Sequence, residues 1–188
     1  MKPVVRVQMA QVTLNDIKQT AIHDKGATSL CLGLCNLQMA AAEVGLVPDL
    51  AQIDLWIDES VRVGALRSQD GVNSDGWIQP GGHEKMAAIV GLDNVEKVYE
   101  KFDVGTITAR LQWKKPVELR DEGKHSLLCV GWYIDTDGKA YGECIDPWPK
   151  TNDQRIDFDR AMTQRLVNGQ WIDSRSIEYI GYFKQRGE

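Results

Sequence analysis

Residues 30–44 are apolar almost all round, and this places the strongest constraint on the fold. The stretch reads Leu-Cys-Leu-Gly-Leu-Cys-Asn-Leu-Gln-Met-Ala-Ala-Ala-Glu-Val. Thr28 and Ser29 precede it and can cap a helix N-terminus, while Gly45 and Pro48 follow it as stop signals. Because a helix without a polar face must be surrounded by other elements, the sequence predicts a buried helix at the centre of the core.

The rest of the chain predicts helices first and strands afterwards. Residues 4–12 predict an edge strand or extended arm, and residues 64–82 predict a long loop rich in Gly, Ser, Asn and Asp. Further helices are expected at 49–63, 83–90 and 94–102. Strands are expected at 106–112, 116–120, 126–134, 139–145 and 177–183. We therefore expect a single α+β domain over residues 1–188, helical at about 14–102 and an antiparallel sheet at about 103–188.

Composition and charge exclude several classes of protein. The chain has 188 residues, of which 43% are hydrophobic and 26% charged, and its net charge is −5. This length fits one domain whose core needs no disulfide or metal to fold. Without a basic block, nucleic acid is not expected as a partner. Without a long apolar run, neither a membrane span nor a membrane partner is expected.

The first residues read Met-Lys-Pro-Val-Val-Arg-Val and lack the apolar core of a signal peptide. We therefore expect a protein that is cytoplasmic when made, and that either stays there or is secreted without a cleaved signal peptide. In a reducing compartment its cysteines are expected to be thiols rather than disulfides.

Cys31 stands at the start of the predicted buried helix. A helix N-terminus carries a partial positive charge and unpaired N–H groups, and both favour the thiolate, which is the nucleophilic form of cysteine. A buried free cysteine is, however, more often an ordinary small apolar residue. Cys35 lies one turn further along on the same face and stays open as an alternative. The sequence therefore predicts a nucleophile in this helix, with Cys31 preferred because of its position.

A second candidate comes from two apolar strands that flank a turn at residues 135–138, which read Asp-Thr-Asp-Gly. If those four residues form the loop, Asp146 lies opposite Leu127 and one diagonal away from His125. Diagonal neighbours are about 7–8 Å apart at Cα, which a carboxylate and an imidazole can span. The alternative is a surface histidine beside a turn aspartate. The spacing thus predicts a His125–Asp146 pair, in which the carboxylate orients the ring of a general base.

The other candidates are weaker. His23 in a polar loop and His83 at a helix start are both interpreted as solvated. A zinc site built from Cys31, Cys35 and a histidine is disfavoured because no paired Cys-x2-Cys is present, so neither a metal nor another cofactor is expected. Trp77, in the predicted long loop, is the candidate substrate contact.

Several segments occur in a fixed order along the chain. They are Leu30-Cys31-Leu32-Gly33-Leu34-Cys35 through Met39, then Lys115-Pro116-Val117, then His125-Ser126-Leu127-Leu128-Cys129-Val130-Gly131-Trp132, and finally Asp146-Pro147-Trp148. Together they resemble the papain-like thiol hydrolases, most closely compact bacterial members such as double-glycine leader peptidases and secreted effector cysteine proteases. The resemblance implies a papain-like α+β fold, with the nucleophile helix packed on a C-terminal antiparallel sheet. It also implies Cys31 as nucleophile, His125 as base and Asp146 as orienting acid.

The chain departs from the family pattern at the oxyanion-hole glutamine, which usually stands about six residues before the cysteine. Lys25 occupies that position here, and the nearest upstream glutamine is Gln19. Gln19 takes this role only if residues 22–28 form a bulging loop. The spacing to Met39 is also one residue too long for Cys31 and several too short for Cys35.

The resemblance implies a cysteine peptidase that hydrolyses a peptide or amide bond through a thioester acyl-enzyme. A bacterial effector or toxin fits this context, with a protein or peptide substrate and an inhibitor or immunity protein as partner. A cell-wall peptide amidase of the NlpC type, or a glutamine deamidase, would use the same triad. Two further alternatives are an inactive papain-like binding or adaptor protein and an α+β domain without an active site.

Overall fold

The protein is described from a computed structural model that covers residues 5–22, 30–71, 74–122 and 125–187. The helices are the short 3-10 helix η1 (Gln19–Ala21) and α1 (Cys31–Glu43), α2 (Leu50–Arg62), α3 (Gly82–Val90) and α4 (Val104–Gln112). The strands are β1 (Val7–Gln11), β2 (Leu66–Ser68), β3 (Ser74–Ile78), β4 (Val95–Lys101), β5 (Val117–Arg120), β6 (Ser126–Ile134), β7 (Ala140–Ile145), β8 (Arg155–Asp157), β9 (Met162–Val167), β10 (Gln170–Ser176) and β11 (Tyr179–Gln185).

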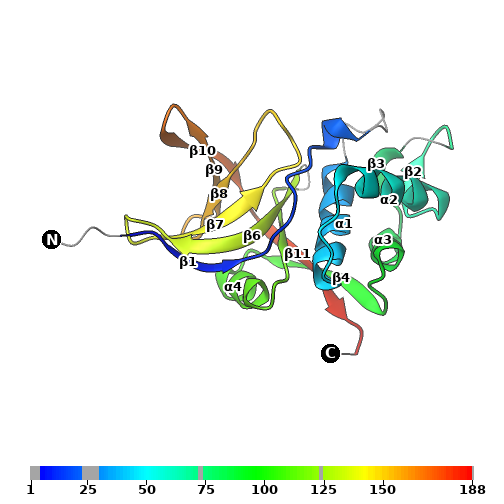
Figure 1. Cartoon of the computed structure of the whole chain (residues 1–188), viewed down its shortest axis with the longest axis horizontal. Helices are drawn as coiled ribbons and strands as arrows, with labels where there is room; N and C mark the ends of the chain where they lie inside the picture. The colour runs from blue at the N-terminus through cyan, green and yellow to red at the C-terminus, as the bar shows by residue number, and fades with distance from the viewer. Residues whose placement is uncertain (1–4, 23–29, 72–73, 123–124, 188) are drawn as a thin grey trace.

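The elements divide into a helical lobe and a sheet lobe (Figure 1). In the described residues, the main sheet has the strand order β10-β9-β8-β7-β6-β5-β11-β4, with β1 added along β6, and all its pairings are antiparallel. Helices α1, α2 and α3 gather at one end with the small β2–β3 sheet, and α4 lies against the main sheet. The expected α+β class, with helices packed on an antiparallel sheet, is confirmed.

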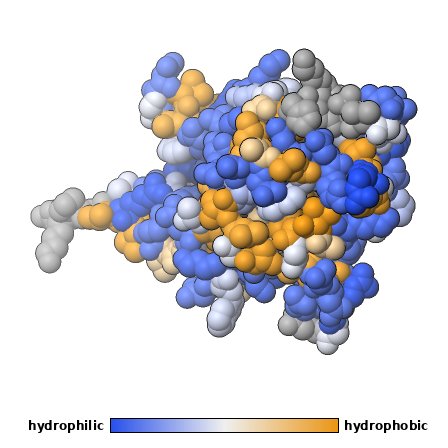
Figure 2. Space-filling view, turned by 45° about the vertical axis from the view of Figure 1, so that its right-hand side comes forward, coloured by the Kyte–Doolittle hydropathy of each residue, from blue (hydrophilic) through white to orange (hydrophobic). Residues whose placement is uncertain are grey.

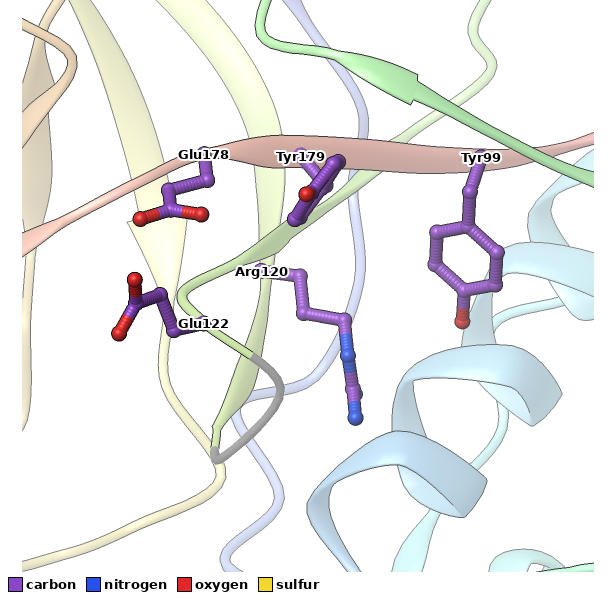
Figure 3. A pocket seen from close by; sticks show the side chains of 5 residues that line it. All are labelled: Tyr99, Arg120, Glu122, Glu178 and Tyr179. Atoms are coloured by element: carbon purple, nitrogen blue, oxygen red, sulfur yellow. The ribbon is translucent and has the colours of Figure 1, made fainter.

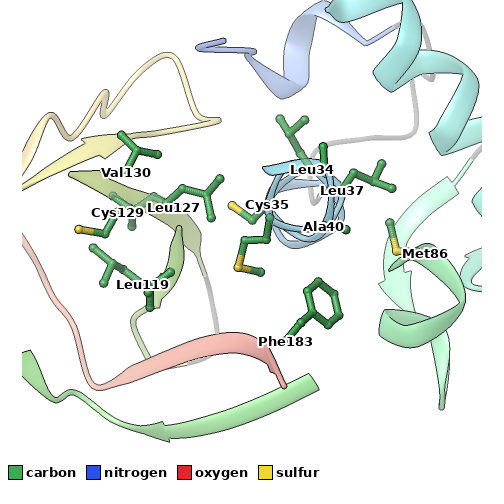
Figure 4. Close-up of a cluster of buried hydrophobic side chains, with 14 of the residues drawn as sticks. Leu34, Cys35, Leu37, Ala40, Met86, Leu119, Leu127, Cys129, Val130 and Phe183 are labelled. Carbon is green, nitrogen blue, oxygen red and sulfur yellow. The ribbon is translucent and has the colours of Figure 1, made fainter. Parts of the chain in front are cut away.

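Helix α1 lies between the two lobes, as its apolar surface predicts. It packs against β6 on one side and against α3 on the other, and Figure 4 shows Cys35 on the sheet side and Met86 of α3 across the helix. Met86 and Leu66 lie 3.5 and 3.6 Å from the position where a Cβ of Gly33 would lie, which is ordinary packing distance. At its C-terminal end, Gly45 adopts a φ of 77°, which an L side chain rarely takes. The expected caps Thr28 and Ser29 lie outside the described residues.

Two predictions about residues 94–112 were wrong. The predicted helix at 94–102 is strand β4, which pairs along its length with β11. The predicted strand at 106–112 is helix α4, and the boundary between helical and sheet parts near residue 102 is therefore not observed. Asp103 explains this helix, because its side chain accepts a hydrogen bond from the backbone N–H of Thr106 at 2.9 Å and caps it.

The prediction of a long loop at 64–82 was also wrong, because this segment contains the paired strands β2 and β3. Strands β8, β9 and β10 were not expected from the sequence at all. They extend the sheet beyond β7 as a meander, visible at the upper left of Figure 1. The residues of β9 and β10 are largely exposed and partly polar, without a clear alternation, and the three residues of β8 are too few to show one.

The β6–β7 register differs from the prediction near the turn and agrees with it near the strand ends. Ile134 pairs with Ala140 rather than with Lys139, so the loop is one residue longer than expected. A β-bulge between Cys129 and Gly131 then inserts one residue on β6 and cancels the difference. Leu128 consequently pairs with Ile145, which brings Asp146 next to Leu127 as predicted.

The described surface is mixed in character. Every helix within the described ranges is too short or too polar to cross a bilayer. Figure 2 shows hydrophobic areas in the middle of one face, bordered by hydrophilic ones. The most exposed large hydrophobic side chains belong to Val5, Leu55, Trp77 and Trp113.

Candidate active site

His125 and Asp146 meet at the ends of the two strands that the predicted hairpin contains. His125 comes directly before β6, Asp146 directly after β7, and the imidazole Nε2 lies 2.6 Å from the Asp146 Oδ1. Both side chains are buried, with 9% and 0% of their surface exposed. The backbone N–H of His125 donates to the Asp121 carboxylate at 2.9 Å, which fixes the start of the strand. The sheet therefore holds a histidine and a carboxylate in direct contact, away from bulk water.

Asp146 is fixed by further donors on the loop that follows it. The backbone N–H of Trp148 donates to Oδ1 at 3.0 Å, while the Asp153 N–H and the Thr151 hydroxyl donate to Oδ2 at 2.9 Å each. Burial alone would raise the pKa of Asp146, but the hydrogen bond and charge of His125 and the backbone N–H groups lower it below its usual range. Asp146 is thus an ionised carboxylate that cannot rotate away from the ring.

Cys31 is the first residue of α1 and brings a buried thiol, 7% exposed, to the same place. Its side chain is among the groups that raise the pKa of His125, so the two side chains are neighbours. Burial would lower the pKa of His125, but the hydrogen bonds and charges of Asp146 and Cys31 raise it to about 9. The ring is therefore set to hold a proton at neutral pH beside a cysteine at a helix N-terminus.

Cys35, the alternative nucleophile, lies apart from this pair. It is fully buried, and it borders a small gap together with Ile17, Leu128 and Pro147. Burial, followed by the charge of Glu118, raises the pKa of the Cys35 thiol well above its usual range. A thiol in this setting packs as a small apolar group, so the geometry favours Cys31 as the reactive cysteine.

Gln19 lies on the segment that crosses the strand ends before α1. It is 2% exposed, and its backbone N–H donates to the carbonyl of Pro147 at 2.9 Å. The Lys18 ammonium also donates, to the Asp146 carbonyl at 2.6 Å. These contacts hold Gln19 beside Pro147, the residue that follows Asp146. Residues 23–29, which would form the expected bulging loop, lie outside the described residues.

His83 is not solvated, so that prediction was wrong. It is partly buried, its Nδ1 lies 2.6 Å from the Asn36 side-chain nitrogen, and its ring meets Tyr99 edge to face. Burial, followed by the charge of Lys97, lowers the pKa of His83 to about 4. The ring accepts from Asn36 in its neutral form. His23, the third histidine, lies outside the described residues. Within the described residues, no cluster of His, Cys, Asp and Glu could hold a metal.

The sequence analysis missed a buried ion pair behind α1. The Lys97 ammonium lies 2.6 Å from the Glu118 carboxylate, with 2% and 0% of their side chains exposed. Lys97 also donates to the Asn36 amide oxygen of α1, and Glu118 accepts from the Ser126 hydroxyl at 2.7 Å. Gly181 makes room for the pair, because a Cβ there would lie 2.7 Å from Glu118. The one signal for this pair in the sequence was Glu118, which stands between Val117 and Leu119 in the predicted strand.

Trp77, the expected substrate contact, is placed on β3 in the helical lobe. Its side chain is 64% exposed, and the Arg67 guanidinium lies 5.2 Å from its ring centre. Among the described residues, no contact joins it to Cys31, His125 or Asp146.

No protein-family model matches this chain, and no curated protein matches it. One solved structure that is similar to it is the crystal structure of a double-glycine-motif protease from an AMS/PCAT transporter, in complex with the leader peptide. The likeness extends over 96% of this chain and 97% of that chain, with 17% identity and a TM-score of 0.45. At this level the case for an activity depends on the geometry of Cys31, His125 and Asp146.

Proposed function

We propose that this protein is a thiol hydrolase that cleaves an amide bond, with a peptide bond as the expected substrate. The observation that carries the proposal is the placement of His125. One ring nitrogen is bound to the buried Asp146 carboxylate at 2.6 Å, and the thiol of Cys31 lies near enough to the same ring to raise its pKa. Nucleophile, base and orienting acid are the parts that this chemistry requires.

The first half of the reaction forms a thioester. The Cys31 sulfur, having given its proton to the ring of His125, attacks the amide carbonyl carbon. The negative charge that develops on the carbonyl oxygen is stabilised by the Cys31 backbone N–H at the helix N-terminus and by the Gln19 side chain, and one such donor contributes about 3 kcal/mol. When the carbon–nitrogen bond breaks, His125 returns its proton to the leaving amine.

The second half regenerates the enzyme. His125, now neutral, takes a proton from water, and the resulting hydroxide attacks the thioester carbonyl. The carbon–sulfur bond breaks, the product leaves as a carboxylic acid, and the proton returns to the Cys31–His125 pair. Throughout both halves, Asp146 keeps the ring oriented and stabilises its protonated form.

The experiment that tests the proposal is alkylation of the native protein with iodoacetamide at pH 6, mapped by mass spectrometry. We expect rapid labelling of Cys31 alone. Cys35, Cys129 and Cys144 serve as internal controls, because burial raises the pKa of each of these thiols. In His125→Ala the rapid labelling should disappear, since the thiolate loses its counter-ion. Slow and even labelling of all cysteines would exclude an activated thiol and leave a binding protein.

Product analysis separates the reactions that the same triad can perform. We would incubate the protein with a peptide mixture and compare it with Cys31→Ala. A peptidase or cell-wall amidase yields two fragments, whereas a glutamine deamidase leaves the chain intact and converts an amide to an acid. Activity that survives Cys31→Ala but is lost in Cys35→Ala would show that the nucleophile is wrongly assigned.

A further inference from the structure

A pocket opens on the sheet lobe beside the candidate active site. It has a volume of about 520 Å³ and is lined by residues of β4, β5 and β11 and the segments that follow or precede them. Its lining residues are Tyr99, Arg120, Glu122, Glu178 and Tyr179 (Figure 3). A volume of this size accommodates a single large side chain of a substrate.

The pocket adjoins the His125–Asp146 pair through the pairing of β5 with β6. Arg120, the last residue of β5, lies opposite Ser126 and donates to its hydroxyl at 2.7 Å. Asp121 then accepts from the backbone N–H of His125, and Glu122 of the pocket follows directly. The pocket lining therefore includes the residue that pairs with Ser126, the direct neighbour of His125.

The pocket lining carries one positive group, Arg120, and two negative groups, Glu122 and Glu178. Besides Ser126, the Arg120 guanidinium has the buried Glu118 carboxylate at 3.6 Å, so its charge is directed into the protein. Figure 3 shows the Glu122 and Glu178 carboxylates turned toward one another, with Arg120 pointing away from them. Burial, followed by the charge of Glu122, raises the pKa of Glu178. A bound cation would relieve this repulsion.

The two tyrosines complete the pocket. The Tyr99 hydroxyl donates to Glu118 at 3.1 Å, which fixes its ring against the pocket wall. Tyr179 pairs with Arg120 on the neighbouring strand and stands over the same space. Aromatic faces and carboxylates suit the apolar stem and charged head of lysine or arginine. A ligand with a carboxylate would instead be repelled by Glu122 and Glu178.

We propose that this pocket is a substrate subsite that binds the positively charged side chain of a lysine or arginine near the scissile bond. The assignment rests on the proposed amide hydrolysis for its place in catalysis. The binding itself depends only on the pocket and can be measured without turnover.

The test is an NMR titration of the ¹⁵N-labelled Cys31→Ala variant with Nα-acetyl-arginine methylamide. We expect shifts centred on Tyr99, Arg120 and Tyr179, and none with the uncharged citrulline analogue. In a Glu122→Gln, Glu178→Gln background, binding should weaken by about tenfold, because two exposed charge interactions are lost. Glu96→Gln removes the same kind of charge from an exposed position on β4 and should leave binding unchanged.

Several outcomes would overturn the subsite. They are equal shifts with the citrulline analogue, binding unaffected by the two glutamine substitutions, shifts that lie elsewhere, or preferential binding of Nα-acetyl-glutamate methylamide. Peaks outside the pocket report whether each variant is folded. A protein that alkylates rapidly at Cys31 but fails this titration retains the proposed function without the subsite. A protein that binds arginine but lacks a reactive thiol is instead a binding protein.

Discussion

Asp146 accepts hydrogen bonds from His125, Thr151, Trp148 and Asp153, so a single carboxylate joins the candidate base to the loop that follows β7. Its charge is also a main cause of the raised pKa of His125, through both the hydrogen bond and the Coulomb interaction. Because the donors leave the carboxylate no freedom to turn, the orientation of the ring is decided at this one residue.

The substitution Asp146→Asn tests that dependence. The amide keeps the size of the side chain but removes its charge, so the pKa of His125 should fall from about 9 toward or below its usual 6.5. We would follow the ring nitrogens by NMR across a pH titration. Asp173→Asn, an exposed aspartate on β10, is the matched control and should leave the pKa of His125 in place. An unchanged pKa in Asp146→Asn would contradict the assigned pairing.

The same variant should change how stability depends on pH. The pKa of His125 is higher in the folded than in the unfolded protein, so protonation of the ring stabilises the fold. This contribution is complete below about pH 6.5 and is lost as the pH rises toward about 9. Urea unfolding at both limits should show that loss in the native protein, and a smaller one in Asp146→Asn.

At the scale of elements, the β6–β7 hairpin positions the site, and its bulge places Asp146 opposite Leu127. Strand β1 pairs with β6 at this point, and Gly131, which has no side chain, lets the two strands approach closely. A Cβ at Gly131 would lie 2.7 Å from the Ala10 carbonyl oxygen and 3.3 Å from the Gln11 Cα. Both neighbours are backbone atoms, which cannot move aside without disturbing β1.

Gly131→Ala should therefore lower the free energy of unfolding by about 1–3 kcal/mol, the usual cost of overpacking. Gly105→Ala is the matched control. Gly105 lies in α4, where the nearest atom to a new Cβ is 3.5 Å away, and alanine favours a helix over glycine by about 0.5–1 kcal/mol. Urea denaturation should show opposite signs for the two variants. A neutral Gly131→Ala would mean that β1 is not held closely against β6.

At the scale of the whole molecule, the Lys97–Glu118 pair of the main sheet is bonded to helix α1. Lys97 comes from β4, Glu118 from β5, and both are linked to α1 through the bond from Lys97 to Asn36. Burial lowers the pKa of Lys97, but the proximity of Glu118 opposes the loss of its charge. The helix that carries Cys31 is thus held against the sheet that carries His125 by a charged contact as well as by apolar packing.

Lys97→Met should destabilise the protein by about 3–5 kcal/mol, because Glu118 is left buried without its counter-ion. Adding Glu118→Leu should restore much of that loss, since no buried charge then remains. A double-mutant cycle from urea unfolding measures the coupling. Arg62→Met and Glu59→Leu, which separate an exposed pair on α2, form the control cycle, for which we expect a much smaller coupling because solvent screens the two charges. Equal coupling in both cycles would contradict the central role of the buried pair.

The sequence by itself determined the parts of this protein that depend on neighbours along the chain. The apolar surface of residues 30–44 predicted α1, and a turn flanked by apolar strands predicted the hairpin and the contact between His125 and Asp146. Residues 94–112 were assigned wrongly because β4 is an edge strand specified by its pairing with β11, and local periodicity does not record such a partner. The catalytic roles of Cys31, His125 and Asp146 stay predictions.

Only the tertiary structure decided what depends on residues distant in the sequence. The bulge in β6, which offsets the turn's extra residue, lies where β1 pairs with β6. Lys97, Glu118 and Asn36 meet only when three elements pack together. His83, which was expected to be exposed, is partly buried because it packs against Asn36 of α1, a residue distant in the sequence. A buried polar group needs partners with correct geometry, and those partners are supplied by the fold rather than by local sequence.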